Sequence, residues 1–157
     1  MSQRPTKGRI LIAGLGNLLL MDDGVGVHAV RELRKGVPRG VVAAEVGTAI
    51  LSALHLFEDA DKVLAIDAMQ AGGTPGTVYR FGLEDVENPT GKPSLHDFGL
   101  RSIFEFLPDH RPEIVVLGVE PEVIEFGMEL SGSVRASLPR LITEAQATIA
   151  RWRTEPS

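Results

Sequence analysis

The sequence predicts an α/β fold, a three-layer sandwich in which helices flank a mostly parallel sheet of five strands. Two observations support this prediction. Short apolar runs typical of strands alternate along the chain with segments of helical periodicity. One run, residues 62–66 (KVLAI), is almost wholly apolar. Such a run is typical of a central parallel strand that is covered on both faces.

The first half of the chain is predicted to alternate strictly between strands and helices. Gly36 and Pro38 are suited to ending the first helix, because glycine accepts a left-handed cap and proline cannot continue a helix. The predicted elements are a strand at 9–13, a helix at 26–34, a strand at 41–46, a short helix capped by Thr48 and running to Leu56, and the strand at 62–66.

The second half is predicted to add two strands and two helices. Residues 77–83 alternate in polarity after a Gly/Pro turn, so we expect an edge strand that pairs antiparallel. Ser94 starts a helix by the Ser-x-x-acid pattern, and an apolar strand follows at 113–117. The last helix has an apolar face over 134–149, with Pro139 either kinking it or marking its first turn.

Length and composition are those of one globular domain. We expect residues 1–157 to form it, with flexible ends at 1–8 and 153–157. The net charge of −5 argues against a nucleic-acid-binding protein, which usually has a basic face. The absence of cysteine excludes disulfides, thiolate metal sites and a cysteine nucleophile. No signal peptide or membrane-spanning run is evident, so we expect a cytoplasmic protein, and a monomer.

A metal site is predicted where strands end at the carboxyl edge of the sheet. Asp22 and Asp23 follow the first strand, Asp67 ends the third, and His96 precedes a helix. Two carboxylates and one imidazole suit a divalent metal such as Ni, Zn, Fe or Mn. A helix N-terminus also disfavours imidazolium, so His96 is expected to be neutral, the form that binds metal.

Each of these residues also has a simpler interpretation. Asp23 suits an exposed turn or the N-cap of the next helix, and His96 suits a cap. Asp22 suits a solvated acid, or one that orients a water or a ligand. Asp67 follows an apolar strand, where a carboxylate is costly unless something pairs with it. The other histidines are expected to be structural or exposed: His28, His55 and His110.

A nucleotide loop was the competing interpretation of the glycines after the first strand. A dinucleotide loop requires G-x-G-x-x-G, but Leu19 stands where the third glycine belongs. No G-x-x-x-x-G-K-[ST] loop occurs in the chain, and the two acids would face the phosphates. The phosphate interpretation is therefore rejected.

The stretch GLGNLLLMDDGVG, residues 14–26, resembles the signature G-x-G-N-x-L-x-x-D-[DE]-x-x-G of the [NiFe] hydrogenase maturation proteases. The resemblance continues in order through nearly the whole chain. The further matching segments are Gly47-Thr48, Asp67-Ala68, Pro75-Gly76-Thr77, Ser94-x-His96, Gly118-Val119-x-Pro121 and Glu125-x-Gly127-x-x-Leu130-Ser131.

The resemblance implies a twisted α/β sheet with flanking helices and an endopeptidase activity. The substrate would be the precursor of the hydrogenase large subunit, which loses a C-terminal extension after nickel insertion. The family's metal-binding residues fall on Asp23, Asp67 and His96, the three residues that the strand-edge argument selects. The Ni²⁺ would be carried by the substrate rather than held by the resting enzyme.

A second group of residues is expected to support the site or recognise substrate: Asp22, Asn17, Glu45, Gly47 and Thr48. The loop at 45–48 departs from the family pattern. It reads Glu-Val-Gly-Thr where Asp-Gly-Gly-Thr is common, and Ala49-Ile50 follows where another glycine is common. Because this loop is associated with substrate recognition in the family, the sequence leaves open which precursor is cut.

Other protease chemistries lack their motifs here. The chain has no H-E-x-x-H zinc motif and no serine in a G-x-S-x-G turn. The hypothesis is that Asp23, Asp67 and His96 bind the substrate's nickel, either for recognition alone or also to polarise the scissile carbonyl or activate water. The alternative is a nickel-binding accessory protein in hydrogenase maturation that has no protease activity.

Overall fold

The computed structural model describes residues 8–82, 100, 106–107, 109 and 112–155. Its five strands form one sheet in the order β2-β1-β3-β5-β4. Strands β2, β1, β3 and β5 are parallel to one another, whereas β4 pairs antiparallel with β5 at one edge. The strands are β1 (Ile10–Leu15), β2 (Val41–Gly47), β3 (Lys62–Ala68), β4 (Val78–Gly82) and β5 (Glu113–Val119).

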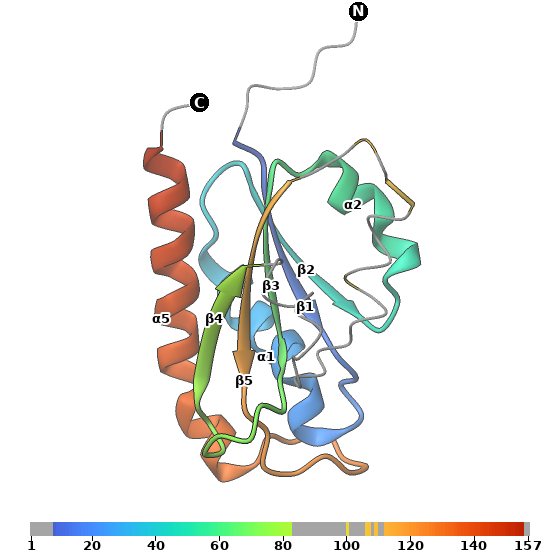
Figure 1. Cartoon of the computed structure of the whole chain (residues 1–157), viewed down its shortest axis with the longest axis vertical. Helices are drawn as coiled ribbons and strands as arrows, with labels where there is room; N and C mark the ends of the chain where they lie inside the picture. The colour runs from blue at the N-terminus through green and yellow to red at the C-terminus, as the bar shows by residue number, and fades with distance from the viewer. Residues whose placement is uncertain (1–7, 83–99, 101–105, 108, 110–111, 156–157) are drawn as a thin grey trace, which may run out of the picture.

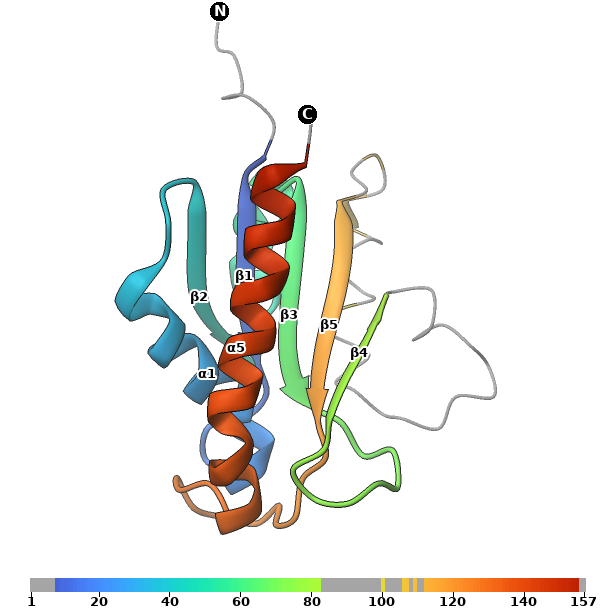
Figure 2. The same cartoon turned by 90° about the vertical axis from the view of Figure 1, so that its left-hand side faces the viewer.

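Helices cover both faces of the sheet, so the molecule has three layers (Figure 1). One face packs against α1 (Val25–Leu33) and α5 (Gly132–Thr154), and the other packs against α2 (Leu54–Asp59). Figure 2 shows α5 running along the first face, roughly parallel to the strands. Three short 3-10 turns are also present among the described residues: Met21–Gly24, Arg34–Gly36 and Leu51–Ala53.

The two apolar cores follow from the alternation of side chains along each strand. Ile12, Leu64 and Leu117 face α1 and α5. Leu11 and Val63 face α2, whose Phe57 is fully buried. All but the first residue of β3 are buried, as expected for a central parallel strand.

The α/β prediction, the mostly parallel sheet and the antiparallel edge strand are confirmed. Two details are wrong. Thr48 caps no helix, because helical structure begins only at Leu51 and its start has no side-chain cap. Pro139 marks no first turn, because α5 begins seven residues earlier, at Gly132. The sequence from Gly132 to Pro139 is already helical, so the proline lies in the helix interior.

Some predictions lie at or beyond the limits of the described residues. The helix predicted from Ser94 falls outside them, apart from Leu100 and Leu107, which pack on the α2 face. The last helix continues to Thr154, within the stretch 153–157 predicted as a flexible end. Across the residues described, no helix is long and apolar enough to span a membrane.

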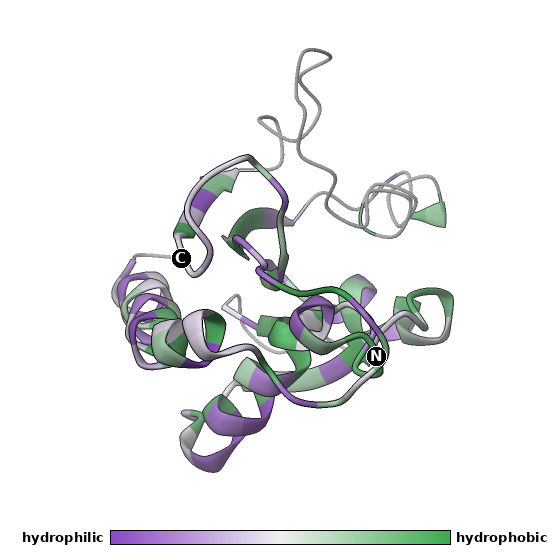
Figure 3. Cartoon of the chain, turned by 90° about the horizontal axis from the view of Figure 1, so that it is seen from below, coloured by the Kyte–Doolittle hydropathy of each residue, from purple (hydrophilic) through white to green (hydrophobic). Residues whose placement is uncertain are grey.

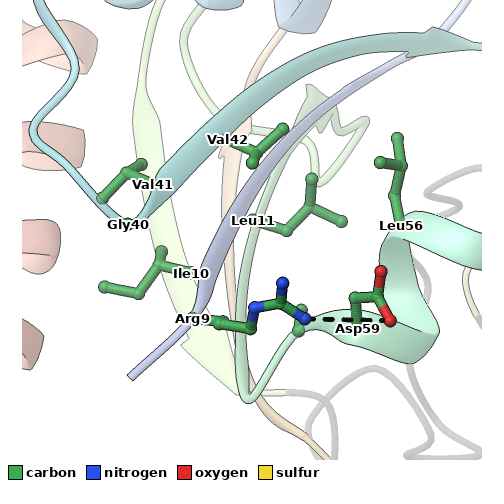
Figure 4. Close-up of a pocket in the computed structure, with 9 residues that line it drawn as sticks. Arg9, Ile10, Leu11, Gly40, Val41, Val42, Leu56 and Asp59 are labelled. Carbon is green, nitrogen blue, oxygen red and sulfur yellow. Dashed lines mark ion pairs between the residues drawn. The ribbon is translucent and has the colours of Figure 1, made fainter. Parts of the chain in front are cut away.

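A cleft of about 240 Å³ lies at the amino ends of β1 and β2, beside α2. Its wall is mostly apolar, and a 3.9 Å ion pair between Arg9 and Asp59 lies at its mouth (Figure 4). None of the predicted site residues lines this cleft. The cleft therefore belongs to the edge of the sheet opposite the one that carries the acidic residues.

Candidate active site

Four parallel strands end at the same edge of the sheet, which Figure 3 views end-on. We call it the carboxyl edge. Asp22 and Asp23 lie in the connection that follows β1, and Asp67 lies near the end of β3, as expected for an open α/β sheet. Strongly hydrophilic and strongly hydrophobic segments lie together in the loops that face the viewer.

Asp67 lies at the end of the central strand β3 and is fully buried. One carboxylate oxygen, Oδ1, accepts a 2.8 Å hydrogen bond from the backbone N–H of Ala68. The buried strand thus fixes the position of the carboxylate. Removing a charge from water in this way is costly without compensating interactions, which is a frequent mark of a functional group.

Asp23 lies in the 3-10 turn Met21–Gly24 and is buried. Its Oδ2 accepts a 2.9 Å hydrogen bond from the backbone N–H of Asn17. The N-cap interpretation is excluded, because Gly24 is the cap residue of α1 and no side chain caps that helix. The Asp23 side chain therefore binds the backbone of the loop that follows β1 and does not cap α1.

Gly16 lies between the backbone carbonyl of Asp23 and the carboxylate of Asp67. Its φ is +103°, a conformation that other residues rarely adopt. A Cβ at this position would overlap the carbonyl oxygen of Asp23 and lie 2.9 Å from Oδ1 of Asp67. Asp67 thus packs against residue 16 and Asp23 bonds to residue 17. Both predicted acids therefore adjoin the same bend of the chain, at residues 16 and 17.

A second pair of glycines allows α1 to approach this edge closely. A Cβ on Gly26 would overlap the carbonyl oxygen of Ile66 and lie 2.6 Å from that of Leu15. A Cβ on Gly14 would in turn overlap the backbone of Gly26. The close approach that a third glycine provides in dinucleotide loops is provided here by Gly26, at the start of the helix.

His96, the third predicted ligand, lies outside the described residues. Within the part of the chain that is described, no three Asp, Glu or His side chains lie close enough to hold a metal ion. Asp23 and Asp67 fit a divalent cation in charge and chemistry, since carboxylate oxygens are common ligands. They need further ligands from elsewhere in the chain or from the substrate.

Asp22 is fully buried, so its interpretation as a solvated acid is wrong. Its oxygens accept hydrogen bonds of 2.7–2.9 Å from the backbone N–H groups of Glu122, Val123 and Ser131 and from the Ser131 hydroxyl. Burial alone would raise the pKa of Asp22, but these hydrogen bonds outweigh it and lower the pKa. Asp22 fastens the loop at 120–131 to the loop that carries Asp23.

Within the described part of the chain, the other residues predicted to support the site or to recognise substrate do not share contacts with Asp22. Asn17 Oδ1 accepts a 2.9 Å bond from the N–H of Leu19, and Gly47 accepts one of 3.1 Å from Gly16 through its carbonyl. Thr48 is exposed. Glu45 pairs at 3.1 Å with Arg31 and Arg34, and the hydrogen bond from Arg31 is the main reason why the pKa of Glu45 is lowered.

Glu120 is a buried carboxylate that the sequence interpretation missed. Its Oε1 accepts hydrogen bonds from the N–H groups of Ala71 and Gly73, at 2.9 and 3.0 Å, and from the Tyr79 hydroxyl at 2.6 Å. Burial raises the pKa of Glu120, but the bond from Tyr79 and those from the loop amides lower it overall. An acid directly after an apolar strand, as at Asp67, was the available signal.

His28 is structural, as expected. Its Nε2 is buried and has no hydrogen-bond partner among the described residues. Burial is the main cause that lowers the pKa of His28, and the nearby positive charge of Arg31 adds to it. The ring lies beside the backbone of Met128, so α1 contacts the loop at 120–131 through it.

The sequence pattern of one protein family, described as hydrogenase maturation protease, matches residues 27–148. The chain belongs to this family. The hydrogenase expression/formation protein HupD of Bradyrhizobium diazoefficiens is 32% identical over 152 residues, which are 92% of this chain and 79% of that protein. The hydrogenase 2 maturation protease of Escherichia coli is 30% identical over 150 residues, 90% of each.

Solved structures agree with this membership. The hydrogenase maturating endopeptidase HybD of E. coli superposes with a TM-score of 0.81 at 29% identity, covering 91% of this chain and 93% of that one. The [NiFe] hydrogenase maturation protease HybD of Thermococcus kodakarensis gives a TM-score of 0.78 at 31% identity, covering 90% and 99%. This maturation protease is thus an endopeptidase on an α/β fold that its relatives share.

Proposed function

We propose that this maturation protease removes the C-terminal extension of a [NiFe] hydrogenase large-subunit precursor after nickel has been inserted. Asp23, Asp67 and His96 bind the nickel that the precursor carries. The nickel is part of the substrate, so cleavage depends on whether the precursor is loaded. We also expect the protein to act in the cytoplasm and as a monomer.

One observation carries the proposal: two buried acids adjoin the same bend of the chain, Asp67 at residue 16 and Asp23 at residues 16 and 17. Two like charges close together in a dry site repel each other, and a cation between them relieves both the repulsion and the loss of water. Gly16 has no side chain that would collide with Asp67 or Asp23, and the backbone N–H of Asn17 holds the Asp23 carboxylate.

The chemistry follows from the charge of the metal. Nickel held between these carboxylates anchors the substrate, and its charge is available to polarise the scissile carbonyl or to lower the pKa of a water. Hydrolysis then adds that water across the peptide bond, with a proton delivered to the leaving amine. His96 enters as a ligand by its resemblance to the family's histidine and by its place before a predicted helix.

The test compares nickel-loaded with nickel-free precursor. Wild type, Asp67→Asn and His96→Ala are incubated with each form, and mass spectrometry follows the length of the precursor. We expect wild type to trim only the loaded form, and each variant to be slower by about 100-fold or more. Asp59→Asn is the matched control, because Asp59 is an exposed acid at the opposite edge.

Equal cleavage of both forms by all the proteins would contradict the proposal. If wild type binds the loaded precursor but leaves its length unchanged, the accessory-protein alternative is supported instead. Thermal shift measurements with Ni²⁺ and with nucleotides distinguish the protease and the accessory protein from a nucleotide-binding domain. Such a domain would be stabilised by nucleotides and not by Ni²⁺.

A further inference from the structure

Two neighbouring loops at the carboxyl edge expose large apolar side chains. Leu19, Ile124, Phe126 and Met128 are 47%, 41%, 84% and 54% exposed. The two loops are joined: the N–H of Gly127 donates to the carbonyl of Leu19, and the N–H of Met21 to the carbonyl of Gly127, both at 2.8 Å. We call these four side chains the apolar ridge. A group of exposed apolar residues on a soluble protein marks an interaction surface.

The ridge is built to keep its shape. The buried carboxylate of Asp22 holds the loop at both ends, through Glu122 and Val123 on one side and Ser131 on the other. Met21 adopts φ of +48°, a conformation that is unfavourable for a residue with a side chain and that the surrounding bonds enforce. A loop ordered in this way presents its apolar side chains at a lower cost in backbone entropy on binding.

The ridge is continuous with the proposed active site. Leu19 follows Asn17, whose N–H bonds to the Asp23 carboxylate, and Asp22 is the neighbour of Asp23. A partner that covers the ridge therefore lies next to the loop that carries Asp23. This position favours the substrate over a separate protein as the occupant.

The charges around the ridge indicate the chemistry of the occupant. Three acids alternate with the apolar residues along the same loop, and all are exposed: Glu122, Glu125 and Glu129. Arg135 contributes a positive charge beside this loop, 3.8 Å from Glu129 in an exposed pair. The whole chain also has a net charge of −5. An occupant with apolar side chains flanked by Lys or Arg is complementary to this surface.

We infer that the apolar ridge docks an apolar segment of the precursor, flanked by basic residues, that lies close to the bond to be cut. This inference rests on the proposed function, because it takes the precursor as the occupant. Docking at the ridge fixes the segment and leaves the carboxylates to the metal. The ridge thus contributes to precursor binding rather than to the chemical step.

Kinetics provide the first test. Phe126→Ser is expected to raise KM for the nickel-loaded precursor about tenfold and to leave kcat within about twofold, because exposed aromatic anchors contribute to binding. Val42→Ser is the matched control: Val42 is also an exposed apolar residue, at 50%, but it lines the cleft at the opposite edge. Glu125→Gln is expected to weaken the salt dependence of KM. An unchanged KM for Phe126→Ser overturns the inference.

Cross-linking tests the ridge without requiring proteolysis. The chain has no cysteine, so Phe126→Cys and Val42→Cys each introduce a single thiol for a photoactivated cross-linker. Each is combined with Asp67→Asn and mixed with loaded precursor. We expect position 126, and not position 42, to cross-link to a precursor segment that contains apolar and basic residues.

The outcomes separate the two proposals. Cross-linking of position 126 to a second copy of the chain, or to nothing, overturns the ridge as a substrate surface even if wild type cleaves the precursor. Cross-linking to the precursor with no cleavage by wild type keeps the ridge and overturns the proposed protease reaction. Cleavage together with the expected cross-link supports both.

Discussion

Asp22 and Asp23 are adjacent acids with different surroundings. Asp23 bonds to Asn17 beside Asp67, in the proposed active site. Asp22 turns away from it and binds backbone N–H groups about 100 residues later in the chain. At the scale of the residue, one acid belongs to the proposed metal site and the other joins two loops.

We expect Asp22→Asn to lower the free energy of unfolding by about 2–4 kcal/mol at pH 7, because an amide cannot accept the full set of hydrogen bonds and loses the charge. The folded state lowers the pKa of Asp22 from its ordinary value of 3.8. Its stabilisation is therefore present above pH 4 and lost as the pH falls through the lowered pKa. Urea unfolding at pH 7 and pH 3 measures the difference, which should shrink in acid.

The control for this experiment is Asp59→Asn, since Asp59 is exposed and its ion pair with Arg9, at 3.9 Å, is a weak surface pair. It should change stability by less than about 0.5 kcal/mol. A difference between wild type and Asp22→Asn that stays constant down to pH 3 would show that the charge of Asp22 is unimportant.

Gly16→Ala should both destabilise the protein and damage the site. The added Cβ would overlap the Asp23 carbonyl and lie 2.9 Å from the Asp67 carboxylate, on a backbone with φ of +103°. Gly40→Ala is the matched control, because φ there is +87° but nothing lies within 4 Å. We expect a loss of roughly 1–2 kcal/mol for Gly40→Ala, from backbone strain alone.

Gly16→Ala should lose more than Gly40→Ala in urea unfolding and should also lose precursor cleavage, which Gly40→Ala should retain. Equal losses for the two variants would mean that strain, and not contact with the carboxylates, sets the requirement for glycine at position 16.

Single residues differ in how far the sequence could predict them. The location of Asp23 and Asp67 at the carboxyl edge was predictable, because Asp67 lies near the end of β3 and Asp23 lies in the connection that follows β1. The role of Asp22 was not, because its partners, at 122, 123 and 131, are distant in sequence. Glu120 was within reach, since it follows an apolar strand as Asp67 does.

The loop at 69–77 depends on contacts between elements. It leaves β3, and Glu120, directly after β5, binds its amides at Ala71 and Gly73. Tyr79, in β4, binds the same carboxylate oxygen. One buried acid thus joins β3, β4 and β5 beside the site.

Glu120→Gln should lower the free energy of unfolding by about 1–3 kcal/mol, because hydrogen bonds to a buried charged acceptor are replaced by weaker ones. The amide protons of Ala71 and Gly73 should exchange faster with solvent, which nuclear magnetic resonance can measure residue by residue. Glu58→Gln, an exposed acid in α2, is the control and should change neither quantity. Unchanged exchange at both amides would contradict the anchoring role.

Elements with a clear pattern were predicted well. The helix at 26–34 is observed at Val25–Leu33, and the strands agree closely with their apolar runs. The start of the short second helix was predicted less well, because a capping pattern is local. Thr48 lies in the turn that follows β2, and helical structure begins only at Leu51. Tertiary packing of α5 on the sheet also outweighs the cost of Pro139 inside it.

At the scale of the whole molecule, the two edges of the sheet are different. The carboxyl edge holds the acidic site, and the amino edge holds interactions that attach α5. Lys62, at the start of β3, pairs with Glu155 at 2.6 Å and lies 5.8 Å from the ring centre of Trp152. The Trp152 indole N–H donates to Glu113 at 3.2 Å.

Trp152→Phe should therefore lower stability by about 1–2 kcal/mol, through loss of the hydrogen bond and a weaker contact with Lys62. Cleavage of the precursor should be unchanged, because the substitution lies at the opposite edge from Asp23 and Asp67. Circular dichroism measures the unfolding, and Arg151→Gln serves as an exposed control on the same helix. A loss of cleavage in the folded variant would show that the edges are coupled.

The first strand begins and the last helix ends at the amino edge, on the side away from the site (Figure 1). This has a practical consequence for handling the protein. The described chain begins near Ile10 and ends near Glu155, both at the edge opposite the proposed active site. A tether joined beyond these positions should therefore leave the apolar ridge open to a large incoming substrate.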